Sequence, residues 1–243
     1  MLALSNSDIL TLVNLPSIIA AVQEAALAIQ DRQTVLPERQ HLDWDGTTLL
    51  IMPARASQAV GVKLVSVIPG NAERGLPVTN GTMLLNDGAT GLPLCIMNAA
   101  QLTAVRTGAI SALSIQRMTP QAMTSLGIVG FGIQGAWQAI CACAVRPIEE
   151  VFYWARSPRR ELQFFQTVHQ HAPAVRLTSC PNVATLLSKR SLVITATTSP
   201  LPVLPDEPDL LRGKHFISVG SFKPSMQELP TSIYRMAGQL VVD

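Results

Sequence analysis

The sequence has little charge, few aromatic side chains and no regular spacing of metal-binding residues. Of its 243 residues, 14% are charged and 5% are aromatic, and the net charge is +2. Because it has no Lys/Arg-rich run and no repeated basic and aromatic pattern, it lacks the signature of a nucleic-acid partner. The four histidines are not spaced as metal ligands are, so no metal site is predicted.

Cysteine and long apolar runs are also scarce. The four cysteines include Cys141 and Cys143, which lie two residues apart on an expected helix and point to different sides, so neither a zinc site nor a disulfide follows. No uninterrupted apolar stretch reaches the roughly 18 residues of a membrane-spanning helix. The first residues show no basic leader and no cleavage pattern. We therefore expect a cytoplasmic protein with reduced thiols and no membrane partner.

What the sequence does have is 48% hydrophobic residues, arranged differently in its two halves. Residues 1–36 begin with a helical pattern, for which Ser7 and Asp8 offer a cap and Ile18, Ile19, Val22, Ala26 and Ile29 share a face. Short strands are then expected at 48–52, 60–68, 82–86 and 92–97, with a hairpin turn at 87–91, followed by a helix over 102–118.

From residue 119 on, apolar strands alternate with helical patterns. Strands are expected near 125–130, 150–155, 175–178, 191–196, 215–219 and 239–242. This alternation predicts a doubly wound α/β fold with a parallel sheet. We expect two domains, an α+β domain over 1–118 and a Rossmann domain over 119–243. An apparent sixth strand at the end of the chain suggests truncation, because a domain seldom ends flush with a central strand.

A glycine motif opens the second half. Gly130, Gly132 and Gly135 form G-x-G-x-x-G between a short apolar run and a helical pattern, the arrangement of a dinucleotide-binding βαβ unit. The first glycine permits the tight turn, the second lets the backbone approach a pyrophosphate, and the third lets the helix pack close to the strand. The free N–H groups of the helix then hold the pyrophosphate. An ordinary glycine-rich turn is the alternative interpretation.

The residues after the next strand indicate which dinucleotide binds. An NAD site carries Asp or Glu about 20 residues beyond the glycines, but this chain has Arg156, Arg159 and Arg160 there. Guanidinium groups favour a 2′-phosphate, so NADPH is predicted, with NADH possible. The alternative is that the arginines are a solvated helix start, although arginine at a helix N-terminus opposes the dipole.

Several motifs together resemble the ornithine cyclodeaminase/mu-crystallin family. They lie around Lys63, Asn71 and Pro77, in the helix segment around Arg106, in the glycine motif, and from Ser218 to Leu229. The resemblance covers about four-fifths of the chain. It implies a first half that binds substrate and dimerises and a second half that binds the cofactor. Family members usually continue for tens of residues further, which again suggests a truncated chain.

The resemblance also implies the site residues. Arg39, Lys63 and Arg106 match the family's grip on the substrate carboxylate, and two guanidinium groups with an ammonium would hold it without rotation. Arg39 could instead be a surface arginine, and Lys63 could leave the core along its flexible stem. Lys63 is also the candidate catalytic residue, as proton donor or only as carboxylate ligand. The expected cofactor contacts are Thr107, Gly130, Gly132, Ile133, Gln134, Gly135, Arg156, Ser157, Arg159, Thr195, Thr197 and Val219.

One position departs from the cyclodeaminase pattern. Cyclodeaminases carry Asp where this chain has Phe222, and Gly220 and Pro224 fix the register on both sides. Phenylalanine cannot exchange protons, so Phe222 is interpreted as an apolar substrate contact. The resemblance is then nearest to the Δ1-pyrroline-2-carboxylate reductases, and the expected activity is NADPH-dependent reduction of Δ1-pyrroline-2-carboxylate or Δ1-piperideine-2-carboxylate to L-proline or L-pipecolate.

Other functions remain open. An ornithine cyclodeaminase, an alanine dehydrogenase or an opine-type enzyme would share the carboxylate grip and the cofactor. A mu-crystallin-like protein would bind NADPH and a small carboxylate without turnover. The expected partners are a small imino or amino acid substrate and a second copy of the chain, and neither nucleic acid nor membrane is expected.

Overall fold

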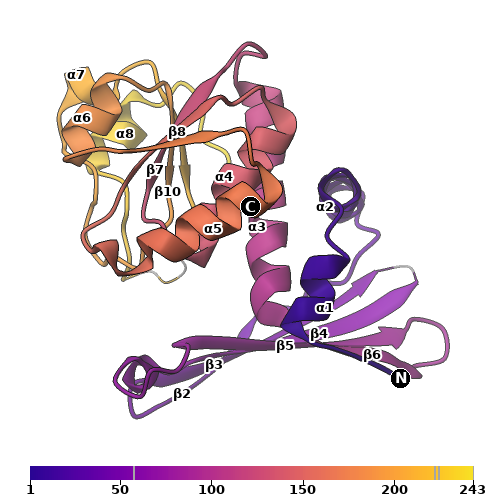
Figure 1. The fold of residues 1–243 in the computed structure, drawn as a ribbon. Helices are drawn as coiled ribbons and strands as arrows, with labels where there is room; N and C mark the ends of the chain where they lie inside the picture. Colours follow the sequence, from indigo (N-terminus) through magenta and orange to yellow (C-terminus); the bar gives the residue numbers. More distant parts are fainter. Residues whose placement is uncertain (57, 222, 224, 243) are drawn as a thin grey trace. The chain divides into compact units, whose positions relative to one another are not determined.

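The computed structural model describes residues 1–56, 58–221, 223 and 225–242 (Figure 1). It divides into two compact units, Met1–Arg106 and Thr107–Asp243. The division falls within helix α3 (Ala99–Met118), whereas the expected domain boundary lay at the end of this helix. Within the described residues, no helix is both long and apolar enough to cross a membrane.

The first unit is built on a six-stranded sheet in the order β1-β6-β5-β4-β3-β2. The pairing of β1 with β6 is parallel and the others are antiparallel. The expected hairpin turn runs from Asp87 to Gly91. The Asp87 carboxylate accepts hydrogen bonds from the backbone N–H and the hydroxyl of Thr90, and Gly91 has a φ of +73°. The strands are β1 (Leu2–Leu4), β2 (Gln40–Trp44), β3 (Thr47–Ala56), β4 (Ala59–Val67), β5 (Thr79–Asp87) and β6 (Pro93–Asn98).

Two helices at the start of this unit replace the single helical pattern of the sequence. Helix α1 (Asn6–Thr11) is capped by Ser5, whose hydroxyl accepts from the Asp8 backbone while the Asp8 carboxylate accepts from Ser5. The N-cap is thus Ser5 rather than Ser7, and Asp8 completes the capping box. Helix α2 (Leu15–Gln30) has its own cap at Asn14. A short 3-10 helix, η1 (Pro69–Ala72), follows β4.

The two faces of the first sheet differ. Helices α1 and α2 lie on one side of it (Figure 1). On that side Gly81 faces the start of α3, because a Cβ built on it would lie 3.0 Å from the Ala99 Cβ. Gly81 pairs with Val65, two residues from Lys63, so Lys63 shares the helix-covered face. The opposite face carries exposed apolar side chains: Leu42 (56%), Trp44 (46%), Leu64 (39%), Leu94 (44%) and Ile96 (37%). We call these five the outer patch.

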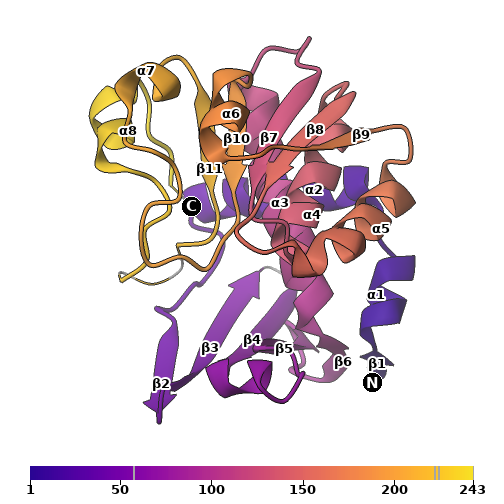
Figure 2. The same cartoon turned by 60° about the vertical axis from the view of Figure 1, so that its left-hand side comes forward.

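The second unit has a five-stranded, wholly parallel sheet in the order β11-β10-β7-β8-β9. Read from β9, this is the 3-2-1-4-5 order of a doubly wound dinucleotide-binding sheet (Figure 2). The α/β Rossmann fold predicted from the alternating pattern is thereby confirmed. The strands are β7 (Ser125–Val129), β8 (Glu150–Trp154), β9 (Arg176–Ser179), β10 (Leu192–Thr195) and β11 (His215–Ser218).

Helices pack on both faces of this sheet. A Cβ on Gly127 of β7 would lie 2.4 Å from the Leu186 side chain of α6, whereas the neighbouring Ile128 lies beside Gly135 of α4. Because successive strand residues point to opposite faces, α6 and α4 cover opposite sides. The remaining elements of the unit are α4 (Ile133–Val145), η2 (Pro158–Arg160), α5 (Glu161–His171), α6 (Val183–Ser188), α7 (Pro208–Leu211) and α8 (Thr231–Met236).

The C-terminal end of α3 is held by one buried arginine. The Arg146 guanidinium donates to the carbonyl oxygens of Ile115, Gln116 and Thr119 at 2.8–3.0 Å. These carbonyls lie at the end of the helix, where the last four have no partner within the helix. A cation at this position also complements the helix dipole. Arg146 therefore fixes α3 within the second unit.

Three strand assignments from the sequence were wrong or incomplete. Residues 239–242, expected as a sixth strand, form none, and Leu240, Val241 and Val242 are 62–83% exposed. An extended segment becomes a strand only when a neighbour pairs with its backbone. Conversely, β1 and β2 were not expected, because β1 is only three residues long and β2 is exposed at every position, without apolar alternation.

Candidate active site

The first unit gathers three positive side chains. Lys63 lies in the middle of β4, Arg106 lies on α3, and Arg39 directly precedes β2. Burial, followed by the nearby charges of Arg106 and Arg39, together lower the pKa of Lys63 to about 8. The structure thus brings together the three residues expected to hold a substrate carboxylate.

Lys63 carries this charge without a balancing acid. No described carboxylate forms an ion pair with it, and its neighbours across the sheet are Met52 and Met83. A half-buried ammonium beside two guanidinium groups is electrostatically unfavourable unless an anion joins them. The cluster is consequently suited to a small carboxylate ligand.

The second unit presents the glycine motif at the carboxyl end of β7. Gly130 has a φ of +92°, and a Cβ there would lie 2.7 Å from the Ala196 carbonyl oxygen. A Cβ on Gly135 would lie 2.1 Å from the Gly130 carbonyl oxygen, so only glycine allows α4 to pack this close. These contacts fit the turn and packing roles predicted for the first and third glycines.

The N-terminus of α4 is open to an anion. Gly132 caps this helix without a side-chain hydrogen bond, and the nearest atom to a Cβ built on it is Arg160 Nη1, at 3.8 Å. Ile133 is 41% exposed, and the buried Oε1 of Gln134 has no hydrogen-bond partner among the described residues. Free backbone N–H groups, space and a nearby guanidinium together suit a pyrophosphate.

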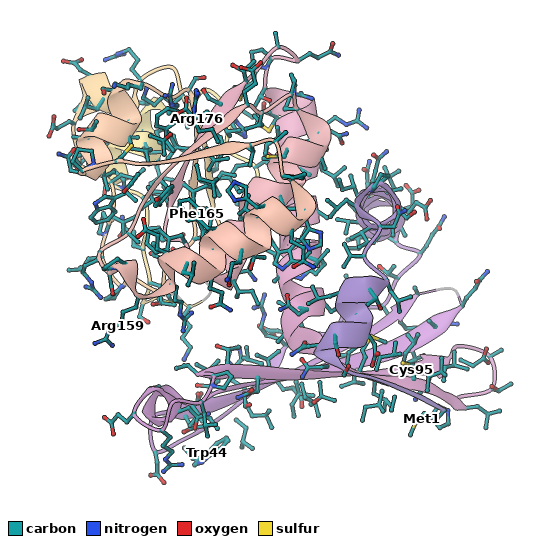
Figure 3. All side chains as sticks on the ribbon, in the orientation of Figure 1. Met1, Trp44, Cys95, Arg159, Phe165 and Arg176 are labelled. Atoms are coloured by element: carbon teal, nitrogen blue, oxygen red, sulfur yellow. The ribbon has the colours of Figure 1, made fainter. Side chains whose placement is uncertain are left out.

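The loop after β8 supplies cations and no free acid. Arg156, Ser157 and Arg159 are exposed, and Arg159 projects away from the ribbon (Figure 3). Ser157 caps η2 by accepting from the Arg159 backbone. Glu161, the first carboxylate beyond the strand, accepts a hydrogen bond of 2.6 Å from the Tyr153 hydroxyl. The loop therefore differs from a site where a carboxylate holds a ribose 2′-hydroxyl.

The other predicted cofactor contacts lie at the ends of β10 and β11 and on α3. Thr197 is half-buried, and the Val219 backbone donates to Thr195. Thr195 is fully buried and its hydroxyl donates to Glu228, so its side chain does not face solvent. Thr107 lies on α3 just beyond Arg106, and Phe222 lies outside the described residues.

Two residues of the site were not predicted as contacts. The sequence indicates Arg160 only as a member of the arginine cluster, yet it lies beside Gly132. Glu228 belongs to the motif from Ser218 to Leu229, and its buried carboxylate accepts hydrogen bonds from the ends of β10 and β11. No spacing rule signals either position, because the contacts join segments far apart in the sequence.

Comparison with known proteins identifies a family. The sequence profile of the ornithine cyclodeaminase/mu-crystallin family matches residues 3–243. The chain belongs to this family. The resemblance inferred from the motifs around Lys63, Arg106 and the glycines is thereby confirmed.

Individual family members agree with this assignment. A Δ1-pyrroline-2-carboxylate reductase of Bacillus thuringiensis is 34% identical over 249 residues, which cover 100% of this chain and 75% of the relative. The structure of the Thermococcus litoralis Δ1-pyrroline-2-carboxylate reductase in complex with NADH and L-proline has a TM-score of 0.89 at 30% identity, covering 97% and 73%. An archaeal alanine dehydrogenase dimer with bound NAD has a TM-score of 0.86 at 26% identity, covering 97% and 72%.

The lowered pKa of Lys63 yields a prediction. Replacing Arg106 by Met should raise this pKa from about 8 toward, but not to, the ordinary 10.5, because burial, the largest cause, remains. The folded chain binds fewer protons than the unfolded chain between these values, so its unfolding free energy should rise with pH there. ¹³C NMR titration of reductively methylated lysines, assigned with Lys63→Arg, measures the pKa.

The control is Arg55→Met, which removes an exposed arginine of β3. Arg55 pairs with Val60 and so lies on the opposite face of the sheet from Lys63. The Arg55→Met substitution should therefore leave the pKa of Lys63 unchanged. An unchanged pKa in Arg106→Met as well would contradict the clustering of the two charges.

Proposed function

We propose that this protein reduces a cyclic ketimine acid, Δ1-pyrroline-2-carboxylate or Δ1-piperideine-2-carboxylate, with a nicotinamide dinucleotide, forming L-proline or L-pipecolate. The observation that carries the proposal is the cluster of positive charges around Lys63 in one unit, together with the open glycine turn in the other. The relatives named Δ1-pyrroline-2-carboxylate reductases support it.

In this proposal, Arg39, Lys63 and Arg106 hold the substrate carboxylate. Two guanidinium groups and an ammonium fix its orientation through charge-assisted hydrogen bonds. A nicotinamide dinucleotide bound at the glycine turn would supply a hydride to C2 of the C=N bond. Correct orientation of the two reactants removes on the order of 7–11 kcal/mol of barrier, so positioning is the main contribution of the protein.

The nitrogen of the C=N bond must carry a proton to accept the hydride. A cyclic iminium can arrive already protonated, which fits a chain with Phe222 in place of the cyclodeaminase Asp. Lys63 is the second source, since its lowered pKa makes its ammonium a stronger acid than an ordinary lysine. Either route places the proton on the nitrogen and leaves no need for a further carboxylic acid.

A turnover panel tests the proposed reaction. The protein should oxidise NADPH or NADH with pyrroline-2-carboxylate or piperideine-2-carboxylate, and release no ammonia from ornithine. Pyruvate with ammonia is the competing substrate pair, because an alanine dehydrogenase shares the fold at a TM-score of 0.86. Arg106→Ala should abolish turnover of any carboxylate substrate, and Arg55→Ala should not. Ammonia release from ornithine would assign a cyclodeaminase, and binding without turnover a ligand-binding protein.

We further propose a preference for NADPH over NADH. Arg156, Arg159 and Arg160 follow β8, in the segment where an NAD site carries a carboxylate, and Glu161 is engaged by Tyr153. The relatives with known complexes contain NADH or NAD, so this chain would differ from them. The cytoplasm, where these cofactors are abundant, is the proposed location.

Replacement of Arg156 by Ala tests this preference. Loss of one charge-assisted contact to phosphate is worth roughly 1.5–3 kcal/mol, so the KM for NADPH should rise about tenfold to a hundredfold while that for NADH changes little. Arg212→Ala, at an exposed arginine before β11, is the matched control. Equal use of both cofactors by the unmodified protein would contradict the preference.

A homodimer formed through the first unit is the proposed assembly. The outer patch of five exposed apolar side chains lies on the sheet face opposite α1 and α2. Exposed apolar side chains gathered on one face mark protein interfaces, and the archaeal alanine dehydrogenase is described as a dimer. The first unit is therefore proposed as the substrate-binding and dimerisation domain, and the second as the cofactor domain.

Sedimentation velocity tests the dimer. Leu64→Lys places a charge within the outer patch and should convert a dimer into a monomer at micromolar concentration. Leu162→Lys makes the same change at a 72% exposed leucine of α5 and should leave the dimer intact. A monomeric unmodified protein would exclude this assembly.

A further inference from the structure

Glu228 is the most deeply buried acidic side chain of the second unit among the described residues, with 1% of its surface exposed. It lies between β11 and α8. No cation is paired with it in the described structure. Hydrogen bonds satisfy its charge instead, as a buried carboxylate requires.

Five donors surround the carboxylate. Its Oε1 accepts from the Thr197 backbone N–H at 2.6 Å and from the Thr197 hydroxyl at 2.8 Å. Its Oε2 accepts from the Thr195 hydroxyl at 2.9 Å, the Ser218 hydroxyl at 2.8 Å and the Gly220 backbone N–H at 2.7 Å. An ionised carboxylate offers about four lone-pair sites, so these five donors saturate it.

The donors come from the ends of two neighbouring strands. Thr195 is the last residue of β10 and Ser218 the last of β11, and Thr197 and Gly220 follow each strand by two residues. One carboxylate thus fixes both strand ends and the two loops that leave them. The Glu228 backbone N–H in turn donates to the Ser221 hydroxyl. This bond ties the segment that carries Glu228 to the loop after β11.

These strand ends have a defined place relative to a dinucleotide. Such a ligand lies across the carboxyl ends of the strands, at the point where the strand order reverses. Here that point lies between β7 and β10. The loop with Arg156, Arg159 and Arg160 follows β8, on one side of this reversal point, so the adenosine half of the dinucleotide is expected beside that loop. The nicotinamide half is then expected on the other side, over the ends of β10 and β11.

We propose that Glu228 is a positioning residue, which holds the loops after β10 and β11 in the arrangement that orients the nicotinamide ring for hydride transfer. This inference rests on the proposed function. The carboxylate acts only as an acceptor, because every lone-pair site already receives a donor, and it does not supply the proton of the reaction. Its effect reaches the cofactor through the backbones of Thr197 and Gly220.

Glu228→Gln tests the proposal, because the amide keeps the size of the side chain but turns one acceptor into a donor facing other donors. We expect kcat for imine reduction to fall about tenfold to a hundredfold, the range expected for misplaced reactants. The affinity for ADP-ribose and its 2′-phosphate, which lack nicotinamide, should stay within about twofold. Glu207→Gln, at an exposed glutamate before α7, is the matched control and should change neither.

Two smaller substitutions keep the test decisive if Glu228→Gln does not fold. Thr195→Val and Ser218→Ala each remove one hydroxyl donor and leave the carboxylate in place. Each should lower kcat less than Glu228→Gln, with unchanged ADP-ribose affinity and little change in thermal unfolding temperature. Where the double variants with Glu228→Gln fold, their effects should be less than additive, because all act through one hydrogen-bonded group.

Three outcomes overturn the inference. One is a kcat within twofold of the unmodified protein in Glu228→Gln. Another is an equal loss of ADP-ribose affinity and kcat in the single-hydroxyl variants, which would reflect general loss of structure. The third is an unmodified protein that binds ADP-ribose but transfers no hydride to any substrate. In that case both the proposed function and the role of Glu228 fail, and the result is distinguishable because it is obtained before any variant is made.

Discussion

The contact between the backbone of Gly130 and that of Gly135 sets the geometry on which the second unit depends. The approach leaves no room for a side chain, because a Cβ on Gly135 would lie 2.1 Å from the Gly130 carbonyl oxygen. It places the first turn of α4 directly against the end of β7, with its N–H groups at the carboxyl edge of the sheet. The same helix packs against α3, where a Cβ on Gly108 would lie 2.8 Å from the Trp137 carbonyl oxygen. The helix that carries the anion site is thus fixed from two sides by backbone packing.

Charge is distributed between the units in a way that suits their proposed ligands. The first unit collects ammonium and guanidinium groups around Lys63, whose pKa falls to about 8 because burial and like charges oppose its protonated form. The second unit presents partial positive charge at the α4 N-terminus and full charges in the arginine loop. Its buried acid, Glu228, is turned inward and saturated by donors. The two carboxylates Glu161 and Glu228 of this unit are both engaged by hydrogen bonds.

The sequence predicted those parts of the fold that depend on local pattern. Alternating apolar segments predicted the parallel sheet, and the glycine spacing predicted the β7–α4 turn. Both signals are carried by residues that lie close together in the sequence. The edge strand β2 was missed because its five residues are all exposed and show no alternation. The segment 239–242 reads as a strand by composition, yet strand formation requires a partner that composition does not reveal.

The candidate site was predictable to the same extent. Lys63 was evident as a charge within an apolar strand, and its lowered pKa follows from that location. Arg160 and Glu228 could not be found by spacing, since the first lies beside a glycine 28 positions earlier and the second receives donors from residues 8 to 33 positions earlier. Only the folded chain brings these groups together.

The hydrogen bonds of Glu228 also bear on the source of the proton. In a chain that has Phe222 where cyclodeaminases have Asp, the nearest acid along the sequence would be the natural substitute. Glu228 cannot take that role without giving up donors, because backbone N–H groups of Thr197 and Gly220 point at its two oxygens and cannot rotate away as hydroxyls can. In the proposed reaction, proton supply then falls to the iminium itself or to Lys63, and both fit a reaction that adds hydride to an already activated C=N bond. Deamination of an open-chain amino acid requires a group that repeatedly accepts and returns protons, and the described carboxylate at this edge of the sheet is not available for it.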